Sequence, residues 1–360
     1  MISTINVKIG DEAIFNDTKM TSLEPMELFK YLVLAEQEWC EYVVLEVSSH
    51  ALDQHRFYGV EFDGAILTNI TPEHLDYHRT MEEYIATKKK LFQNVMNNSN
   101  GKRLAVLPKD DPVGRKWADS MMFSNQQFFG IESNASVQAD NIQSHKDKMS
   151  FEFSYLGTDY QIETGMLGEF NVYNMLAAIA MGLNLQVSID DVVDSVQKVN
   201  WLPGRLEYFE KQGINFYLDY AHTEDALEKV LDYLNTIKGD SRLIVVFGAP
   251  GMRDKYKRPK MWKIADELSD VMIVTDDDPD KENHLEIIKQ IAEGVDREYG
   301  DDYWIMPERY YALKLAIDIA DEWDLVAMTG LGHQQCQVTN FGKRDWNDKE
   351  KVLEILDEWS

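Results

Sequence analysis

Short apolar runs alternate with longer amphipathic segments in the second half of the chain. Runs of about five apolar residues are typical of buried strands, and apolar positions spaced three and four apart predict helices. Strands are expected at 214–218, 243–247, 271–275 and 325–329, and helices at about 224–237, 259–268, 285–299 and 309–323. This alternation indicates an α/β domain with a parallel sheet covered on both faces.

The segment after each of these four predicted strands is rich in Gly, Asp, His or Arg. The segments read DYAHT (219–223), FGAPGMRDK (247–255), TDDDPDKENH (275–284) and TGLGHQQ (329–335). Ligands of open parallel sheets bind beyond the carboxyl ends of the strands. The pattern therefore predicts one binding site formed by these segments.

The first half mixes strands and helices with less regular spacing. Two alternating runs on either side of LGTD (156–159) predict a hairpin, and Pro203-Gly204 favours a domain boundary. Two domains are therefore expected, at 1–200 and 201–360. In the first, strands are expected at 64–70, 103–107, 148–155 and 160–166, and a helix at about 171–185.

The run YVVLEVSSH (42–50) places a carboxylate inside an apolar segment. A run this apolar predicts a strand buried on both faces. Glu46 within it would be costly to bury unless it is paired or holds a metal. Two serines and a histidine follow where the strand should open into a loop, so the sequence predicts the edge of an active site here.

A helix is expected to begin at Thr80, because Thr80-Met81-Glu82-Glu83 forms a capping box. The spacing of its apolar positions puts Lys88 on the apolar face. The ammonium group there must pair, extend to solvent or lose its charge. Two interpretations stay open: an ion pair with a nearby carboxylate, or a neutral amine that captures carbon dioxide as a carbamate able to orient a metal.

The composition and net charge of the chain argue against several classes of binding partner. The formal net charge is −27 over 360 residues, which opposes binding to nucleic acid and to anionic membranes. No stretch is long and apolar enough to span a bilayer, and no secretory signal opens the chain. Cys40 and Cys336 suit two free thiols in a reducing cytoplasm.

Several motifs together resemble the Mur ligase family. Residues 46–92 begin EVSSHALDQHRFYG and contain TPEHLDYH, and the second half contains LPGRLE, DYAHTEDALEKVL, FGAPGMRDKYKRP, TDDDP and GLGHQQCQ in the family order. The resemblance covers essentially the whole chain. It is strongest to the branch that adds the third residue to UDP-N-acetylmuramoyl-L-Ala-D-Glu, and SSHALDQHR favours this branch over a folylpolyglutamate-type ligase.

The resemblance implies a role for individual residues. Glu46 and His74 would hold Mg²⁺, and Lys88 would be a carbamylated lysine. Thr21, Ser22, Ser48, Gln54 and Arg56 would bind the UDP-muramoyl dipeptide; Asn174, Arg205, Asp219 and His222 would bind ATP; Asp277, Asp278, Asp280, Gly330 and Gln334 would bind the incoming amino acid.

The resemblance also implies a reaction. ATP would phosphorylate the terminal carboxylate of the peptide, and the amine of the amino acid would attack the resulting acyl phosphate. Mg²⁺ would offset the negative charge that gathers at the phosphate. The product would be a precursor of peptidoglycan.

The chain departs from the family in one large respect. It contains no G-x-x-x-x-G-K-S/T phosphate loop. We therefore expect a truncated Mur-ligase central ATPase domain, without the N-terminal UDP-binding domain, followed by a Rossmann-like C-terminal domain. The phosphate loop would then belong either to a longer polypeptide of which this chain is a part, or to a separate chain. The alternative function is a non-catalytic, Mur-ligase-like binding protein.

A second departure concerns specificity. Family members that use meso-diaminopimelate carry D-N-P-R where this chain has Asp277-Asp278-Pro279-Asp280. An arginine would pair with the distal carboxylate of diaminopimelate, whereas Asp280 suits a side chain that ends in a cation. The other interpretation is that Asp280 faces solvent in an acidic chain.

Overall fold

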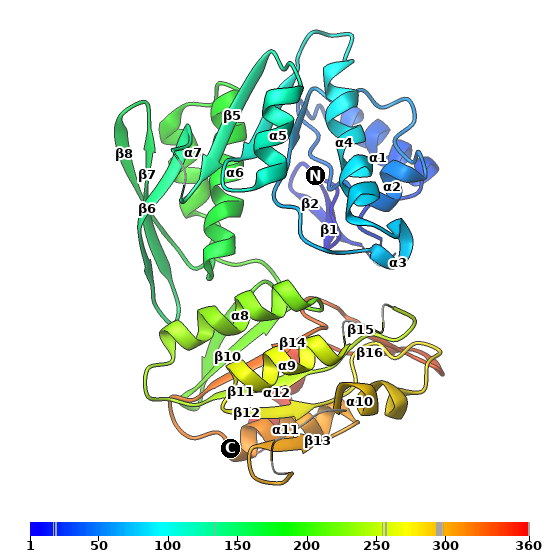
Figure 1. Ribbon diagram of the computed structural model, residues 1–360, viewed down its shortest axis with the longest axis vertical. Coiled ribbons are helices and arrows are strands. Elements are labelled where there is room, and N and C mark those ends of the chain that lie inside the picture. Colours follow the sequence, from blue (N-terminus) through cyan, green and yellow to red (C-terminus); the bar gives the residue numbers. More distant parts are fainter. Residues whose placement is uncertain are drawn as a thin grey trace. The chain divides into compact units, whose positions relative to one another are not determined.

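The computed structural model describes residues 1–16, 18, 20–132, 134–253, 255, 258–292, 297 and 299–358. The chain forms two compact units. The first comprises Met1–Ser136 and Ala180–Gln186, and the second comprises Val137–Ile179 and Val187–Ser360. Figure 1 labels the elements of both units.

The first unit contains the three parallel strands β3-β4-β5, which are neighbours in that order in a six-stranded sheet, and a small antiparallel pair, β1 and β2. Its strands are β1 (Asn6–Ile9), β2 (Glu12–Phe15), β3 (Gly64–Ile66), β4 (Leu104–Pro108) and β5 (Asn125–Gly130). Its helices are α1 (Pro25–Gln37), α2 (Ser49–Asp53), α3 (Leu75–His78), α4 (Met81–Met96) and α5 (Pro112–Ser120).

Helix α4 begins where the sequence predicts. The Thr80 side chain accepts a hydrogen bond from the backbone N–H of Glu83, which satisfies a free donor of the first turn. Phe92 and Val95 of α4 pack with Trp117 of α5 and Ala105 of β4 in one buried cluster. Burial of this apolar face holds α4 beside the sheet.

The prediction of a buried strand at 42–47 is wrong. Leu45 forms one isolated bridge with Ile2, and no regular strand is assigned at 42–47. Tyr42 is 60% exposed and Val44 is 64% exposed, and Glu46 is exposed as well. An apolar run becomes buried only where other segments cover both of its faces, and among the described residues Ile2 supplies the one backbone pairing.

The second unit begins with an antiparallel meander of β6, β7 and β8. The predicted hairpin is confirmed, with a tighter turn than expected: Leu156 and Gly157 both have positive φ, as type I′ turns require. The elements here are β6 (Val137–Ser144), β7 (Met149–Tyr155), β8 (Thr158–Thr164), α6 (Glu169–Asn184) and α7 (Ile189–Gln197). The last residues of α6 belong to the first unit.

A six-stranded sheet in the order β13-β12-β11-β14-β10-β9 follows, parallel except for β9. Its strands are β9 (Glu207–Lys211), β10 (Ile214–Asp219), β11 (Leu243–Phe247), β12 (Val271–Val274), β13 (Tyr303–Ile305) and β14 (Leu325–Thr329). The helices are α8 (Glu224–Ile237), α9 (Arg258–Leu268), α10 (His284–Ala292), α11 (Arg309–Ile319) and α12 (Asp348–Asp357); β15 (Cys336–Thr339) and β16 (Gly342–Asp345) form a separate pair.

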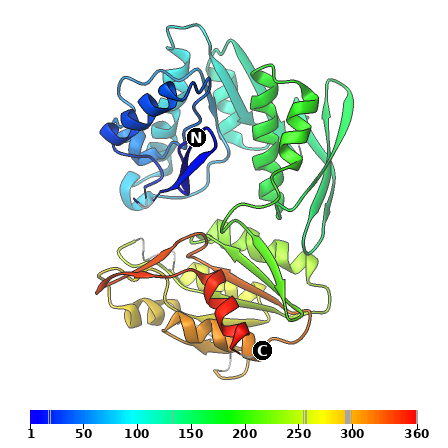
Figure 2. The same ribbon diagram turned by 180° about the vertical axis from the view of Figure 1, so that it is seen from behind.

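Helices cover both faces of this sheet, as predicted. Helices α8 and α9 lie in front of it in Figure 1, and α12 lies in front in the reverse view of Figure 2. Phe216, Val246 and Val326 on the second face are buried against α11 and α12. The α/β class and the four predicted parallel strands are confirmed.

Two helix ends differ from the prediction. Helix α11 ends at Ile319 rather than near Trp323, because Ala320 is extended and Trp323 has a φ of 79°. Helix α10 is described to Ala292, and Tyr299 lies in a β-bridge with Tyr303. For α11, the apolar spacing typical of a helix continues in the sequence beyond Ile319, where the helix ends.

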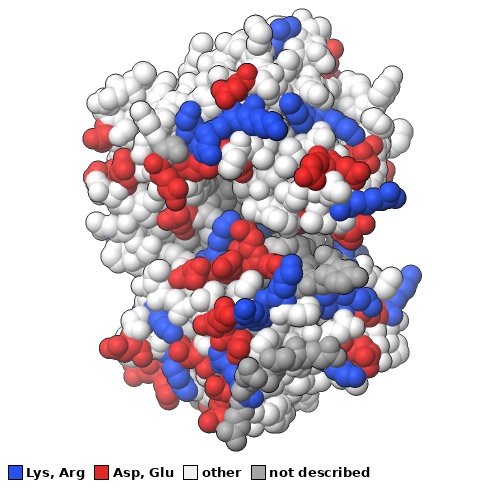
Figure 3. Space-filling view, viewed as in Figure 1, with Lys and Arg blue, Asp and Glu red and all other residues white. Residues whose placement is uncertain are grey.

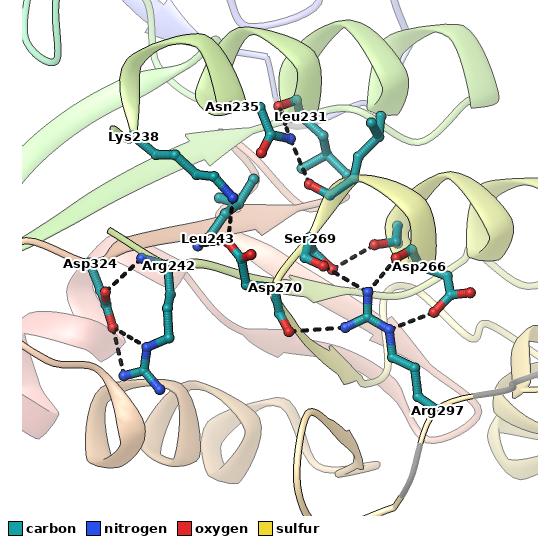
Figure 4. A network of polar contacts seen from close by, with 12 residues as sticks. Leu231, Asn235, Lys238, Arg242, Leu243, Asp266, Ser269, Asp270, Arg297 and Asp324 are labelled. Atoms are coloured by element: carbon teal, nitrogen blue, oxygen red, sulfur yellow. Dashed lines mark hydrogen bonds and ion pairs between the residues drawn. The ribbon is translucent and has the colours of Figure 1, made fainter. Parts of the chain in front are cut away.

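Polar side chains join the amino ends of the parallel strands (Figure 4). Arg242, before β11, donates to Asp324, before β14, with Nε 2.9 Å from Oδ2. Arg297 donates to Asp266 Oδ1 at 2.5 Å and to the carbonyl oxygen of Asp270 at 3.1 Å. These contacts occupy the edge opposite to the predicted site, so the network supports the sheet rather than the site.

Charged side chains of both signs are interspersed on the face drawn in Figure 3. The negative net charge is therefore not a continuous acidic coat on that face. Both cysteines are free thiols. Within the described ranges, no helix has the length and apolar character needed to cross a bilayer.

The exposure of residues 42–47 makes a testable contrast between two valines. Val44→Thr should change the free energy of unfolding by less than about 0.5 kcal/mol, as surface substitutions do. Val246→Thr buries a hydroxyl group in β11, where Val246 is fully buried, and should cost about 1–3 kcal/mol. Urea unfolding of the two variants measures the difference. Equal large losses would show that Val44 is covered in solution.

Candidate functional site

Glu46 is held at an exposed position by residues of the N-terminal segment. Its Oε2 accepts hydrogen bonds from Thr4 N at 2.7 Å and from Thr4 Oγ1 at 2.8 Å. Thr4 Oγ1 also lies 3.0 Å from Thr21 Oγ1. Oε1 of Glu46 accepts no hydrogen bond from the described residues, so this oxygen can bind a ligand.

Lys88 and His74 lie in the same region of the first unit. Burial lowers the pKa of Lys88, and the carboxylates of Glu73 and Glu46 oppose that effect. The ammonium lies 5.1 Å from the centroid of the Tyr84 ring. His74 Nε2 lies 3.6 Å from Glu73 Oε1. The first unit thus places Glu46 close enough to Lys88 to affect the pKa of its amine, and it places His74 beside Glu73.

The predicted substrate-binding residues of this unit lie in one connected group. Ser22 Oγ donates to Glu46 O at 3.0 Å and accepts from Ser48 N at 2.9 Å. Arg56 Nη1 donates to Ser22 O at 2.9 Å, and Arg56 Nη2 donates to Gln54 Oε1 at 2.6 Å. Ser48 also caps α2. These bonds fix the group beside Glu46 before any ligand binds.

The side chains of this region can supply only part of the ligand set of a Mg²⁺ ion. Within the described residues, no group of three or more His, Cys, Asp or Glu side chains is arranged to hold a metal. Mg²⁺ usually keeps several waters and takes one or two carboxylates plus substrate phosphates. The open oxygen of Glu46 suits that arrangement, and Glu73 adds a second carboxylate nearby.

In the second unit, the loops after β10, β12 and β14 pack closely together. Gly330 N donates to Asp219 O at 3.1 Å. A Cβ at Gly330 would lie 2.0 Å from Asp277 Oδ2, and a Cβ at Gly204 would lie 2.2 Å from His333 N. Both glycines have positive φ. Only glycine allows these approaches, so the predicted meeting of the strand ends is confirmed.

Asp219 is buried and holds two of these loops. Its Oδ2 accepts from Leu206 N and its Oδ1 accepts from Ala221 N, each at 2.7 Å. Burial raises the pKa of Asp219, while the Arg205 guanidinium lowers it. Both carboxylate oxygens are thus used by the protein backbone.

Arg205 and His222 both contact Tyr220. The Arg205 guanidinium is 5.4 Å from the centroid of the Tyr220 ring, and His222 Nδ1 is 2.9 Å from Tyr220 O. Asn174 is exposed on α6 and donates to Asn171 Oδ1 at 3.2 Å.

The acidic segment after β12 is attached to β15. Asp278 Oδ1 accepts from Val338 N at 2.7 Å, and Asp280 N donates to Val338 O at 3.0 Å. Asp280 is partly exposed, with a φ of 50°. Gln334 makes a side-chain hydrogen bond to Tyr220. Among the described residues, none donates a hydrogen bond to the Asp280 carboxylate, which can therefore meet a ligand.

Sequence reasoning missed two buried arginines that build this edge. Arg258 donates to both carboxylate oxygens of Glu282, each at 2.9 Å, and to Pro250 O. Arg309 donates to both oxygens of Asp348, at 2.8 and 2.6 Å. Each arginine begins a helix, but an arginine at a helix start is usually exposed, so the sequence carried no signal that either one is buried.

Models of two protein-domain families match most of the chain. The model of the Mur ligase middle domain matches residues 1–182, and the model described as "Mur ligase, glutamate ligase domain" matches residues 204–332.

Curated relatives match along almost the whole chain. A UDP-N-acetylmuramoyl-L-alanyl-D-glutamate–2,6-diaminopimelate ligase of Fusobacterium nucleatum is 36% identical over 352 residues, which are 97% of this chain and 70% of the relative. The ligase of the same name from Clostridium botulinum is 35% identical over 363 residues, 99% of this chain and 72% of the relative.

Solved structures of Mur ligases have a similar fold. A structure of a UDP-N-acetylmuramoyl-L-alanyl-D-glutamate–2,6-diaminopimelate ligase aligns with a TM-score of 0.65 at 28% identity, over 99% of this chain and 73% of that chain. MurF ligase from Thermotoga maritima in complex with ADP aligns with a TM-score of 0.66 at 17% identity, over 91% of this chain and 71% of that chain. None of these findings supports a separate chain that supplies a phosphate loop, and the predicted truncation stays a prediction.

The ion pair of Glu282 and Arg258 predicts a pH-dependent loss of stability. Hydrogen bonds from Arg258 hold the pKa of Glu282 well below its usual range, so the pair stabilises the fold above the unfolded-state pKa and the effect is lost as pH falls through the folded-state pKa. Glu282→Gln leaves the buried guanidinium unpaired and should cost roughly 3 kcal/mol at pH 7.

Urea unfolding at pH 7 and pH 3 measures this effect. The cost of Glu282→Gln should be smaller at pH 3, and Glu286→Gln, an exposed change on α10, is the matched control. A cost that does not change with pH would contradict the assignment.

Proposed function

The chain belongs to the Mur ligase family, and we propose that it is an ATP-dependent amide ligase that adds a diamino acid to UDP-N-acetylmuramoyl-L-Ala-D-Glu. The observation that carries this proposal is the 36% identity to a ligase of that dipeptide over 97% of the chain. The reaction supplies a peptidoglycan precursor. Because its substrates are ATP and a UDP-linked peptide, we assign the protein to the cytoplasm.

The two units take different parts of the reaction. The terminal carboxylate of the peptide receives the γ-phosphoryl group of ATP and becomes an acyl phosphate. The amine of the amino acid then attacks the carbonyl carbon, and phosphate leaves. We assign the peptide and the metal to residues of the first unit, and ATP and the amino acid to residues found mainly in the second unit.

In the first unit, Glu46 and His74 hold Mg²⁺, which offsets negative charge on the phosphates when bound. The open Oε1 of Glu46 supports this role. The peptide substrate is bound by Thr21, Ser22, Ser48, Gln54 and Arg56. The hydrogen bonds among Ser22, Ser48, Gln54 and Arg56 support a preformed site.

In the second unit, ATP is bound by Asn174, Arg205, Asp219 and His222. Arg205 and His222 both lie beside the Tyr220 ring, and we propose that all three side chains meet the nucleotide. Asp219 acts through the loops that it holds, because both of its oxygens accept backbone hydrogen bonds. We place the domain boundary at residues 200 and 201, which the interval between the two family matches supports.

The amino acid is bound by Asp277, Asp278, Asp280, Gly330 and Gln334. The curated relatives are named as diaminopimelate ligases. In this chain, an acidic side chain at position 280 favours an amino acid whose side chain ends in a cation, such as lysine or ornithine. We therefore propose a terminal-amine substrate for this ligase.

Ligation assays test both the reaction and this preference. A version of the chain extended upstream to include a phosphate loop, supplied with ATP, Mg²⁺ and the UDP-muramoyl dipeptide, should join lysine or ornithine more efficiently than meso-diaminopimelate. Asp280→Arg should shift the ratio of kcat/KM toward diaminopimelate by about tenfold or more, and Asp301→Arg, an equal charge change at an exposed site, should not. Absence of product with any diamino acid would overturn the ligase function, and retained binding of the precursor would then support the non-catalytic alternative.

Lys88 is proposed to carry a carbamate that orients the metal. The lowered pKa increases the fraction of neutral amine, and that amine adds to carbon dioxide with release of one proton. Incubation with ¹³C-labelled bicarbonate should give a protein-bound carbamate signal by NMR. Lys88→Arg should abolish the signal and Lys89→Arg should keep it; a signal that survives Lys88→Arg would contradict the assignment.

A further inference from the structure

Helix α3 is a single turn that carries His74 at its start. His74 and Arg79, which flank the turn, both have positive φ, at 57° and 65°. Isolated helices this short are unstable, because nucleation costs more than one turn of hydrogen bonds returns. Left-handed residues of this kind also cost free energy. The orientation of His74 therefore depends on side-chain contacts from neighbouring elements.

Asp53 at the end of α2 supplies the first set of contacts. Tyr77 Oη, on α3, donates to Asp53 Oδ2 at 3.0 Å. Lys90 Nζ, on α4, donates to Asp53 Oδ1 at 2.8 Å. One carboxylate thereby joins three helices, and each of its oxygens accepts a different donor.

The histidine rings supply the second set. The His50 ring contacts the Tyr77 ring, with centroids 4.2 Å apart, and meets the His74 ring edge-on at 4.6 Å. His78 at the end of α3 is buried, and its Nε2 lies 2.9 Å from the buried Oγ of Ser49. A continuous path of contacts therefore runs from Asp53 through Tyr77 and His50 to His74.

We propose that Asp53, Tyr77 and His50 are positioning residues that fix the His74 ring for metal binding. This inference rests on the proposed role of His74 at the Mg²⁺ site. A purely structural role would attach α3 to α2 without affecting the metal. In the positioning role, loss of the Tyr77 hydroxyl frees the His50 ring, and His74 loses its orientation. Outer contacts of this kind commonly change metal affinity by roughly tenfold or more.

Binding of Mn²⁺ to the full chain tests the inference without relying on catalysis. The electron paramagnetic resonance signal of free Mn²⁺ gives the dissociation constant. Tyr77→Phe removes one hydroxyl and should raise that constant by about tenfold. Tyr58→Phe is the matched control, because Tyr58 is an 86% exposed tyrosine of the same unit, and it should bind Mn²⁺ like the unmodified chain.

Two further variants separate positioning from folding. Asp53→Asn weakens the same hydrogen bond, so the double variant of Tyr77 and Asp53 should bind Mn²⁺ no more weakly than Tyr77→Phe alone. His74→Ala removes the proposed ligand itself and should raise the Mn²⁺ dissociation constant. The thermal midpoint of each variant, measured in parallel without metal, identifies any variant whose weaker binding follows from unfolding.

The possible outcomes are distinct. Weaker Mn²⁺ binding by folded Tyr77→Phe, with unchanged binding by Tyr58→Phe, supports the inference. Unchanged Mn²⁺ binding by Tyr77→Phe, together with weaker binding by His74→Ala, overturns the positioning role and leaves the proposed metal site intact. Equal binding by His74→Ala and the unmodified chain, or no Mn²⁺ binding at all, overturns the metal site and the inference together.

Discussion

The buried ion pair of Arg309 and Asp348 determines where the loops at the carboxyl edge of the second unit can lie. Neither side chain is exposed to solvent. Burying two charges is favourable only when each is fully paired, and here the guanidinium also donates to the carbonyl oxygens of Thr329 and Asp276. Those carbonyls end β14 and follow β12. The pair therefore fixes the starting points of the loops that carry Gly330 and Asp277.

The same constraint explains why this edge holds so many charged residues. Backbone groups beyond the end of a strand have no partner in the sheet, and buried ones must find another. Asp219 accepts two such N–H groups, and Arg258 donates to Pro250 O while it pairs with Glu282. Charges used in this way are not available to a ligand. Within the part of the chain that the structure describes, the Arg205 guanidinium and the Asp280 carboxylate form no such hydrogen bond to the backbone, which makes them better candidates for direct contact.

The sequence pattern predicted most strands and helices of the second unit and fewer of those in the first unit. Strands such as β11 and β14 are fully buried and apolar, so local pattern and final environment agree. Residues 42–47 show the same local pattern but lie exposed, because burial depends on which segments cover a run. The motifs pointed to Glu46, Lys88 and the glycine loops as site residues, and their roles stay predictions. The partner of Arg258 could not be predicted, because Glu282 is brought to it only by the folded loops.

Glu46 is exposed, so it attracts a cation differently from a buried carboxylate. A carboxylate in water is screened, so its attraction for a cation is weaker than that of a buried carboxylate. Thr4 orients one oxygen, and the other stays open to solvent. Such a residue binds a hard cation well only when other ligands share the charge. Phosphate oxygens of a nucleotide supply that sharing, so the arrangement around Glu46 favours a metal that binds more tightly once a phosphate is present.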